Sequence, residues 1–422
     1  MVVGLRLPDI SREDAEESLE ELAALARASG ARVVGSELQS RARVDGRTFI
    51  GSGKAQELKD LAARTGANLV LVDHDLSPAQ SRNLEEISGL KVLDRTELIL
   101  DIFARRARTP QAKLQVEVAQ LEYLLPRLTR LWEHLSRLGG GIGTRGPGES
   151  QLEVDRRRIR ERLSRLRKRL QTSGRRLEVQ RGLHSDNFRV ALVGYTSSGK
   201  SSLMNRLTEA DVAAGARLFE TLDATTRVLA LGNGYRATLT DTVGFVRRLP
   251  HSLVESFRAT LAELGSADLL LHVVDLGSIA PQARRDSVET VLEEIGANEI
   301  PQITVYNKCD LVEPDELAGL QKRANGRERA VFASALHGIG TDELREAIRG
   351  ELRRGWLVRE GRLPSGEGEI LARLRACADI VSEKTVRGAL EIRMRIAPAA
   401  WERLRARYGA RAPQLFGRRT AM

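Results

Sequence analysis

One short stretch of this 422-residue chain, Gly194 to Ser201, constrains its fold more than any other. It reads GYTSSGKS, it follows the apolar run 188–193, and a helical pattern begins after Gly199. A glycine-rich turn between a buried strand and a helix points backbone N–H groups into one concavity, where the helix N-terminus also favours an anion. The pattern G-x-x-x-x-G-K-S therefore predicts a phosphate-binding loop in a doubly wound α/β domain.

Each position of this loop has an expected role. Lys200 places a positive charge beside the phosphate oxygens, and the hydroxyl of Ser201 is expected to be a Mg²⁺ ligand. The other residues that we expect to line the phosphates are Gly194, Tyr195, Thr196, Ser197, Ser198 and Gly199.

A second motif, Asp241-Thr242-Val243-Gly244, follows the apolar strand 237–240. An aspartate at the end of such a strand can hold Mg²⁺ through water. The N–H of Gly244 can bind the γ-phosphate, and its glycine backbone can act as a hinge when that phosphate leaves. Downstream of a phosphate loop, we interpret this motif as part of a nucleotide switch.

A third motif, Asn307-Lys308-Cys309-Asp310, follows the strand 302–306. The carboxylate of Asp310 can accept two hydrogen bonds from the edge of guanine, which adenine cannot offer. We expect Lys308 to cover the base plane and to bridge back to the phosphate loop, while Cys309 is the variable position. A backbone N–H from Ser334-Ala335-Leu336 is expected to bind the guanine oxygen. These features predict GTP rather than ATP.

The other half of the switch should lie between Ser202 and Asp241. The candidate is LFETLDATTR, residues 218–227, which offers Thr221, Thr225 and Thr226 as alternative Mg²⁺ ligands. The residue chemistry does not choose among these three threonines.

The first 110 residues alternate strand and helix, which predicts a small parallel α/β domain. Residues 11–29 have the pattern of an amphipathic helix, and Ser77-Pro78 is a typical helix start. Gly51-Ser52-Gly53-Lys54 lacks the first glycine of a phosphate loop at the required spacing, so we interpret it as a tight turn before a helix.

Residues 111–181 predict a long antiparallel helical hairpin, kinked at Pro126. Its glycine-rich tip is GGGIGTRGPGES at 139–150. This segment is either a connector or a tip that enters a narrow, negatively charged space. The expected apolar seams are Leu114, Val118, Leu121, Leu125, Leu128, Trp132 and Leu135 on the first helix, and Leu152, Ile159, Leu163, Leu166 and Leu170 on the second.

The nucleotide domain is expected at 187–353, followed by a connector and a small α+β domain at 366–422. The formal net charge is +10, and residues 151–185 alone carry twelve Arg/Lys against four Asp/Glu. A basic helix this concentrated predicts a polyanionic partner. Two cysteines and no long apolar run predict a reducing cytoplasmic setting without a membrane span.

The chain resembles the HflX family of translational GTPases over nearly its whole length. The matching segments are FIGSGKAQELK, LSPAQSRNLE, VLDRTELILDIFARRA, GGGIGTRGPGES, GYTSSGKSSL, LFETLDATTR and DTVGFVRRLPHSLVESFRATL. The family usually has Asn-Ala where this chain has Ser197-Ser198, and Thr at Ser202; the glycines and the lysine of the loop are kept.

The resemblance implies that Thr221 is the Mg²⁺ ligand of the switch and that Phe219, Glu220, Leu222 and Asp223 border the nucleotide. It also implies docking on the large ribosomal subunit, with the glycine loop toward the rRNA of the peptidyl-transferase centre. Binding would separate stalled or stressed ribosomes into subunits, and we expect a monomer to do so.

Phe245 occupies the position where many small GTPases carry a glutamine that orients the attacking water. A phenyl ring cannot hold that water, so we expect slow intrinsic hydrolysis that the ribosome accelerates. The other interpretation is that the ring simply packs, and the two are compatible. Alternative functions are a large-subunit assembly or hibernation factor, an ATP-dependent RNA remodeller, and an RNA-binding protein with a decayed site.

Overall fold

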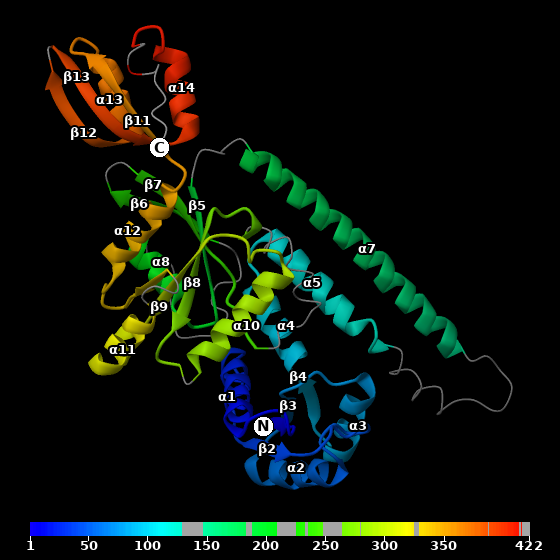
Figure 1. Ribbon diagram of the computed structural model, residues 1–422. Coiled ribbons are helices and arrows are strands. Elements are labelled where there is room, and N and C mark those ends of the chain that lie inside the picture. The colour runs from blue at the N-terminus through cyan, green and yellow to red at the C-terminus, as the bar shows by residue number, and fades with distance from the viewer. Residues whose placement is uncertain are drawn as a thin grey trace.

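Three sheets are arranged in sequence order along the computed structural model, as Figure 1 shows. A four-stranded sheet lies at the bottom of that view, a six-stranded sheet in the middle and a three-stranded sheet at the top. The structure describes residues 1–128, 147–182, 188–208, 225–232, 235–247, 264–278, 280–324, 329–386, 388–412 and 415. No helix in these ranges has the length and apolarity needed to cross a bilayer.

The N-terminal sheet is parallel throughout, in the order β2-β1-β3-β4. Its strands are β1 (Val2–Arg6), β2 (Ser36–Ser40), β3 (Leu69–Val72) and β4 (Lys91–Asp94), and its helices are α1 (Arg12–Ala28), α2 (Ser52–Thr65), α3 (Pro78–Ser88) and α4 (Arg95–Arg106). Because side chains alternate along a strand, Val2 packs with α1 and α4, whereas Val3 packs with α2 and α3. A capping box at Ser77 begins α3 as predicted.

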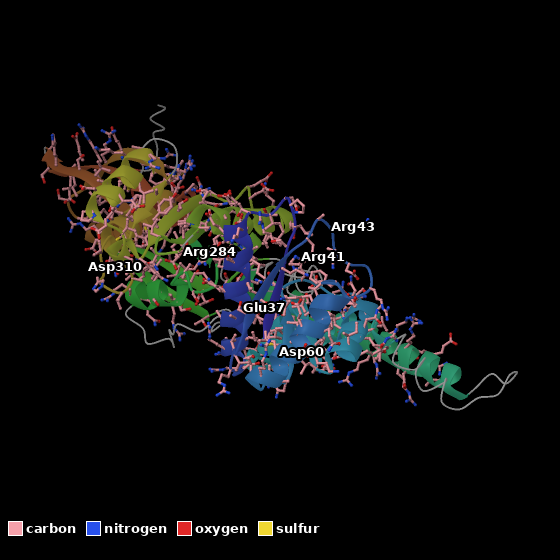
Figure 2. All side chains as sticks on the ribbon, turned by 90° about the horizontal axis from the view of Figure 1, so that it is seen from below. Glu37, Arg41, Arg43, Asp60, Arg284 and Asp310 are labelled. Atoms are coloured by element: carbon pink, nitrogen blue, oxygen red, sulfur yellow. The ribbon has the colours of Figure 1, made fainter. Side chains whose placement is uncertain are left out.

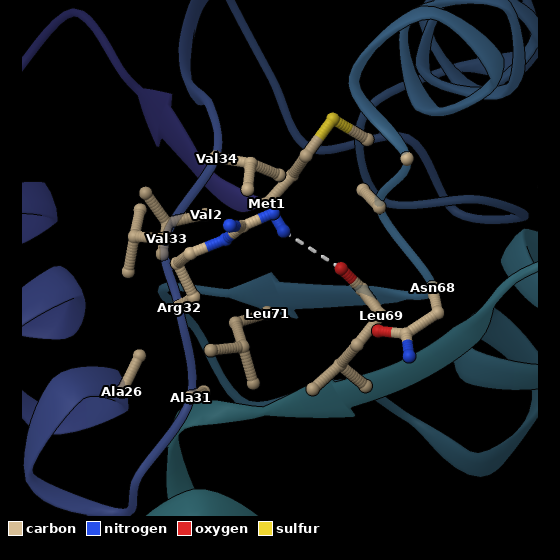
Figure 3. A pocket seen from close by; sticks show the side chains of 12 residues that line it. Met1, Val2, Ala26, Ala31, Arg32, Val33, Val34, Asn68, Leu69 and Leu71 are labelled. Atoms are coloured by element: carbon tan, nitrogen blue, oxygen red, sulfur yellow. Dashed lines mark hydrogen bonds between the residues drawn. The ribbon is translucent and has the colours of Figure 1, made fainter.

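The N-terminal domain also contains a pocket of about 350 Å³, seen in Figure 3. Its wall includes the start of β1, the segment 31–34 and the start of β3, and the Met1 amine donates a hydrogen bond to the Leu69 carbonyl at 2.7 Å. All of its lining residues belong to the N-terminal domain, so it is separate from the phosphate loop.

Helices α5 (Pro110–Leu124) and α7 (Pro147–Gly182) run in opposite directions in Figure 1. They meet along much of the predicted seam, with Leu114, Val118, Leu121 and Leu125 facing Ile159, Leu163, Leu166 and Leu170. Trp132 and Leu135 lie outside the described residues, as does the glycine loop at 139–146. Two details differ from expectation. Pro126 follows the end of α5 instead of kinking it, and residues 147–150 already belong to α7.

The central sheet has the order β10-β9-β8-β5-β7-β6, and only β6 is antiparallel to its neighbour. Its strands are β5 (Phe188–Gly194), β6 (Thr225–Gly232), β7 (Tyr235–Asp241), β8 (Leu269–Asp275), β9 (Gln302–Asn307) and β10 (Ala330–Phe332). The associated helices are α8 (Lys200–Thr208), α10 (Pro281–Glu294), α11 (Pro314–Ala324) and α12 (Thr341–Leu352).

The two faces of this sheet are covered differently. Val190 and Leu192 of β5 face a core closed by α8 and α12. Ala191 and Val193 face the opposite way, into a core that contains α10 and also α1, α4 and α5 of the preceding region. One face of the nucleotide domain is therefore built jointly with the N-terminal domain.

The C-terminal sheet is antiparallel, in the order β11-β13-β12. Its elements are β11 (Leu357–Pro364), α13 (Gly368–Cys377), β12 (Ala378–Val386), β13 (Ala389–Ile396) and α14 (Pro398–Tyr408). The sequence predicted a Gly/Pro-containing connector at 362–368 and a domain start at 366; the structure corrects the start of the connector, because residues 362–364 end β11, which pairs with β13 along its whole length. Pro364 suggested a loop, but an edge strand tolerates proline.

Candidate nucleotide site

The phosphate loop lies between the end of β5 and the start of α8, at the carboxyl edge of the central sheet. Gly199 has φ +93°, and a Cβ at this position would lie 2.2 Å from Nδ2 of Asn307. Only glycine therefore allows the loop to approach the strand that carries the base-recognition motif. The backbone of the loop is shaped by its contact with β9.

Lys200 points back under the loop. Its Nζ donates to the carbonyl oxygens of Gly194 and Tyr195 at 3.0 and 2.8 Å, and the residue is only 6% exposed. Burial lowers the pKa of this ammonium to about 8, and the nearby carboxylate of Asp241 opposes the shift. A phosphate oxygen placed in the loop would add negative charge where this cation lacks solvent.

Ser201 and Asp241 meet beneath the loop. The Ser201 hydroxyl donates to Oδ2 of Asp241 at 2.6 Å, and Thr242 Oγ1 donates to the carbonyl of Leu192 at 2.6 Å. A hydroxyl beside a carboxylate is an oxygen donor set that suits Mg²⁺. Within the described ranges no three His, Cys, Asp or Glu side chains gather into a metal cluster, so a cation here would need ligands besides acidic side chains.

Of the three threonines considered as magnesium ligands, Thr225 and Thr226 lie within the described residues. Thr226 Oγ1 lies 3.0 Å from Thr240 Oγ1 in the β6–β7 pair, on an exposed surface. Thr225 is the first residue of β6 and pairs with Asp241. Phe219, Glu220, Thr221, Leu222 and Asp223 lie outside the described residues.

The segment after Asp241 rests directly on the phosphate loop. Thr196 N–H donates to the Phe245 carbonyl at 2.7 Å, and Phe245 N–H donates to the Gly194 carbonyl at 3.1 Å. A Cβ on Gly244 would lie 2.9 Å from Thr196 Cα and 3.0 Å from Lys200 Nζ, so this close approach requires glycine. Phe245 is 2% exposed and packs in the core shared with the N-terminal domain.

Asn307 joins the two ends of the site. Its Nδ2 donates to the Ser198 carbonyl at 2.8 Å, and its Oδ1 accepts from the Ala335 N–H at 3.0 Å. The phosphate loop and the segment 334–336 are thereby held by one side chain. We expected Lys308 to make the bridge to the phosphate loop; instead its Nζ binds Oδ2 of Asp275 at 2.6 Å.

Asp310 lies in the short 3₁₀ turn Cys309–Leu311 that follows β9. Its Oδ2 is 3.7 Å from Nε2 of His337, so the carboxylate faces the segment that carries Ser334, Ala335 and Leu336. Cys309 points inward, and burial raises the pKa of its thiol. Leu336 is largely exposed at the rim.

Three further residues shape the site without having been predicted: Asp275, Arg206 and Glu21. Asp275 ends the buried strand β8, and an acidic residue closing an apolar run was a readable signal. Arg206 of α8 donates to the carbonyls of Ala335 and Leu336 at 3.1 and 2.5 Å. Oε1 of Glu21 in the N-terminal domain accepts the Tyr195 hydroxyl at 2.5 Å, across 174 positions of sequence. Nothing local in the sequence reveals the last two contacts.

Comparison with known proteins identifies the family of this chain. Family models described as GTP-binding GTPase N-terminal, GTP-binding GTPase middle region and 50S ribosome-binding GTPase match residues 16–104, 106–183 and 189–308. The chain is 48% identical to the GTPase HflX of Caldanaerobacter subterraneus over 81% of this chain and 79% of that protein. It is 43% identical to the GTPase HflX of Escherichia coli over 92% of both chains. This chain therefore belongs to the HflX family of GTPases, whose members hydrolyse GTP.

Proposed function

We propose that the loop Gly194–Ser201 holds the triphosphate of GTP and that Asp310 selects its base. Backbone N–H groups of the loop and Lys200 would bind the phosphates, and the edge of guanine would meet the Asp310 carboxylate. Lys308 would cover the base, with its amine kept in place by Asp275. The hydrogen bond between Ser201 and Asp241 supports this proposal, because it brings together a hydroxyl and a carboxylate that could hold a phosphate-bound cation.

The residues that would hold Mg²⁺ are Ser201 and Thr221 directly, and Asp241 through water. The cation would neutralise charge on the phosphate oxygens as the γ-phosphate departs. The protein's own part is to bind and orient: Lys200 would turn from the Gly194 and Tyr195 carbonyls to the phosphate oxygens, and the Gly244 N–H would donate a hydrogen bond to the γ-phosphate. Phe245 offers no hydrogen bond to water, so basal hydrolysis is slow until a partner orders the switch segments.

We infer that the partner is the large ribosomal subunit and that α7 contributes to docking on its rRNA. Arg160, Lys168 and Arg169 are exposed on α7 and form no ion pair within the described part of the chain. Cations without acidic partners are the ones available to displace counterions from a phosphate backbone. The glycine tip between the hairpin helices would reach toward the peptidyl-transferase centre.

The resulting function is dissociation of stalled or stressed ribosomes in the cytoplasm by a monomer. GTP would favour the docked state, and hydrolysis would release the switch segments and then the protein. The units would be 1–110, 111–181 and 187–353, with a C-terminal domain that begins at β11.

The test is sedimentation of intact ribosomes through a sucrose gradient, with the protein and a non-hydrolysable GTP analogue. Free subunits should accumulate. Intact particles that carry bound protein would contradict splitting and favour an assembly or hibernation factor. In parallel, ATP should compete poorly for the site; equal competition by ATP would instead support an RNA-remodelling ATPase.

A matched pair of variants tests the docking surface. Changing Arg160 and Arg169 to glutamine, which removes two positive charges as the control does, should weaken binding to the large subunit by about tenfold near physiological salt. The control changes Arg162 and Arg167 to glutamine, since these already pair with Glu117 and Glu122 at 2.5 and 2.8 Å. A larger loss in the control than in the test variant would rule out this surface.

A further inference from the structure

The loop that follows β10 uses most of its backbone N–H groups for its own fold. Of the five N–H groups at 334–338, four already donate hydrogen bonds. Those of Ser334, Ala335, His337 and Gly338 donate to the Ile339 carbonyl, Asn307 Oδ1, Ser334 Oγ and the Ser334 carbonyl, at 3.0, 3.0, 3.2 and 2.7 Å. The fifth, on Leu336, has no hydrogen bond within the described part of the chain, and this residue is 73% exposed. The Leu336 N–H is therefore the donor that this loop leaves available for a ligand.

Arg206 of α8 sets the direction of that donor. Its Nε donates to the Ala335 carbonyl at 3.1 Å, and its Nη2 donates to the Leu336 carbonyl at 2.5 Å. The Ala335 carbonyl and the Leu336 N–H belong to the same peptide unit. Because a trans peptide is planar, its C=O and N–H point in opposite directions. By holding the carbonyl, Arg206 directs the Leu336 N–H away from its own guanidinium.

The guanidinium group suits this task better than an ammonium would. It is planar and offers several N–H donors in a fixed arrangement, so that it can hold two neighbouring carbonyls at once. No carboxylate pairs with Arg206 among the residues that the structure describes, so the loop does not compete with an ion pair for these donors. Helix α8 begins at Lys200, in the phosphate loop. Arg206 therefore fixes the loop 334–338 to the same helix that borders the proposed phosphate site.

We propose that Arg206 is a positioning residue for guanine recognition, and that the donor it directs to the guanine carbonyl oxygen is the Leu336 N–H. This inference rests on the proposed function of the site, in which Asp310 accepts the N–H groups of the same edge of the base. Adenine has an amino group in place of that oxygen, so the Leu336 N–H would face another donor and stay unpaired. Arg206 thus contributes to the rejection of ATP through the backbone of the loop.

The experiment replaces Arg206 with methionine in the full chain and measures Kd for three nucleotides. GDP carries the whole base edge, IDP lacks only the amino group, and 6-thio-GDP has sulfur, a weak acceptor, in place of the oxygen. Arg206→Met should weaken GDP and IDP binding about fivefold each, because the peptide unit that carries the donor is no longer fixed. The loss for 6-thio-GDP should stay below about twofold, because this analogue already lacks the acceptor.

Two results with this variant would overturn the proposal. An unchanged Kd for GDP would show that Arg206 does not position the donor. An equal loss for all three nucleotides would show that the substitution damages the site as a whole. A purely structural role for Arg206 predicts this second pattern, so the comparison with 6-thio-GDP separates positioning from general support.

Arg206→Lys separates geometry from charge. Lysine keeps the positive charge but not the planar set of donors, so GDP binding should still weaken by more than about twofold. Full affinity in the lysine variant would mean that charge alone is required, which would overturn the positioning role.

Arg345→Met is the matched control. Arg345 of α12 also donates to a backbone carbonyl of α8, that of Leu207 at 3.4 Å, and it pairs with the exposed Asp342 at 2.8 Å. It makes no printed contact with 334–338, so Kd for GDP should stay within about twofold of the parent. A fivefold loss here, equal to that of Arg206→Met, would assign the effect to the attachment of α8 and would overturn the proposal.

The unmodified protein tests the proposed function separately. It should bind GDP more tightly than IDP, because IDP lacks the amino group that Asp310 would accept. Equal binding of the two nucleotides would contradict base selection by Asp310, whatever the Arg206 variants do. A clear preference for GDP, together with no effect of Arg206→Met, would overturn only the role of Arg206.

Discussion

The N-terminal and C-terminal domains both adjoin the GTPase domain, but they contact it in different ways. On the N-terminal side, Ala191, Val193 and Phe245 share one hydrophobic core with Leu22 and Phe103. On the C-terminal side, the rings of Tyr235 and Trp356 meet with centroids 5.4 Å apart, and Arg353 pairs with Asp379 at 3.2 Å. The C-terminal domain keeps a separate core of its own.

This contrast distinguishes a domain that is coupled to the nucleotide site from a domain that is only attached to the GTPase domain. A shared core with buried charges has few alternative arrangements, because each alternative would expose apolar surface or leave a buried charge without its partner. Contacts between partly exposed side chains, such as this ring pair and this ion pair, can be broken and reformed at small cost. Movements of the N-terminal domain should therefore affect the nucleotide site, whereas the C-terminal domain can move without doing so.

Arg95→Met removes a buried cation on the N-terminal side and should have the largest effect on the free energy of unfolding. It leaves Glu21 and Asp73 buried without their cation, which typically destabilises a protein by ~3–5 kcal/mol. Urea denaturation of the full chain would measure the loss. A change below about 1 kcal/mol would show that the network is not a structural support, and the contrast between the two domains would fail.

Asp310→Asn acts on the residue proposed to select the base, which Figure 2 labels well apart from Glu37 and Asp60 of the N-terminal domain. An amide cannot accept both guanine hydrogen bonds, so GTP affinity should fall about tenfold to a hundredfold, or ~1.4–2.8 kcal/mol. Titration with a fluorescent GTP analogue would measure it. Asp315→Asn removes an exposed charge nearby and serves as the control. Equal losses in both variants would point to general electrostatics.

Arg353→Met removes an ion pair on the C-terminal side and should have the smallest effect on stability and on GTP turnover. The pair with Asp379 is partly exposed, so its loss should destabilise the chain by no more than about 1 kcal/mol and leave GTP turnover unchanged. Denaturation and a GTPase assay on the same sample would decide. A clear change in turnover would mean that the C-terminal domain is coupled to the site after all.

Local patterns explain why so much of the fold could be predicted. The strand before Gly194, the helix after it, the helix start at Ser77 and the seam around Leu163 all depend on residues close in sequence. The motifs at Asp241 and Asn307 were placed at the ends of adjacent or nearby parallel strands, where the topology brings them together.

Distant partners explain what could not be predicted. Residues 362–364 were predicted to belong to a connector because Pro364 and a glycine-containing run follow, and only their pairing with β13 makes them the end of β11. Glu21 and Tyr195 are ordinary residues in their own segments, and their significance arises from contact across the domain boundary. The bond between Lys308 and Asp275 likewise depends on two strands lying side by side.

Asn307 has one more consequence. The Asn307 amide is hydrogen-bonded both to Ser198 and to Ala335. It therefore keeps the phosphate-binding loop and the segment expected to bind the base at a fixed separation. A preorganised pocket of this kind gains most from a ligand that spans it. Guanosine and pyrophosphate, offered as separate molecules, should together bind far more weakly than one nucleotide that links them, as in any chelate.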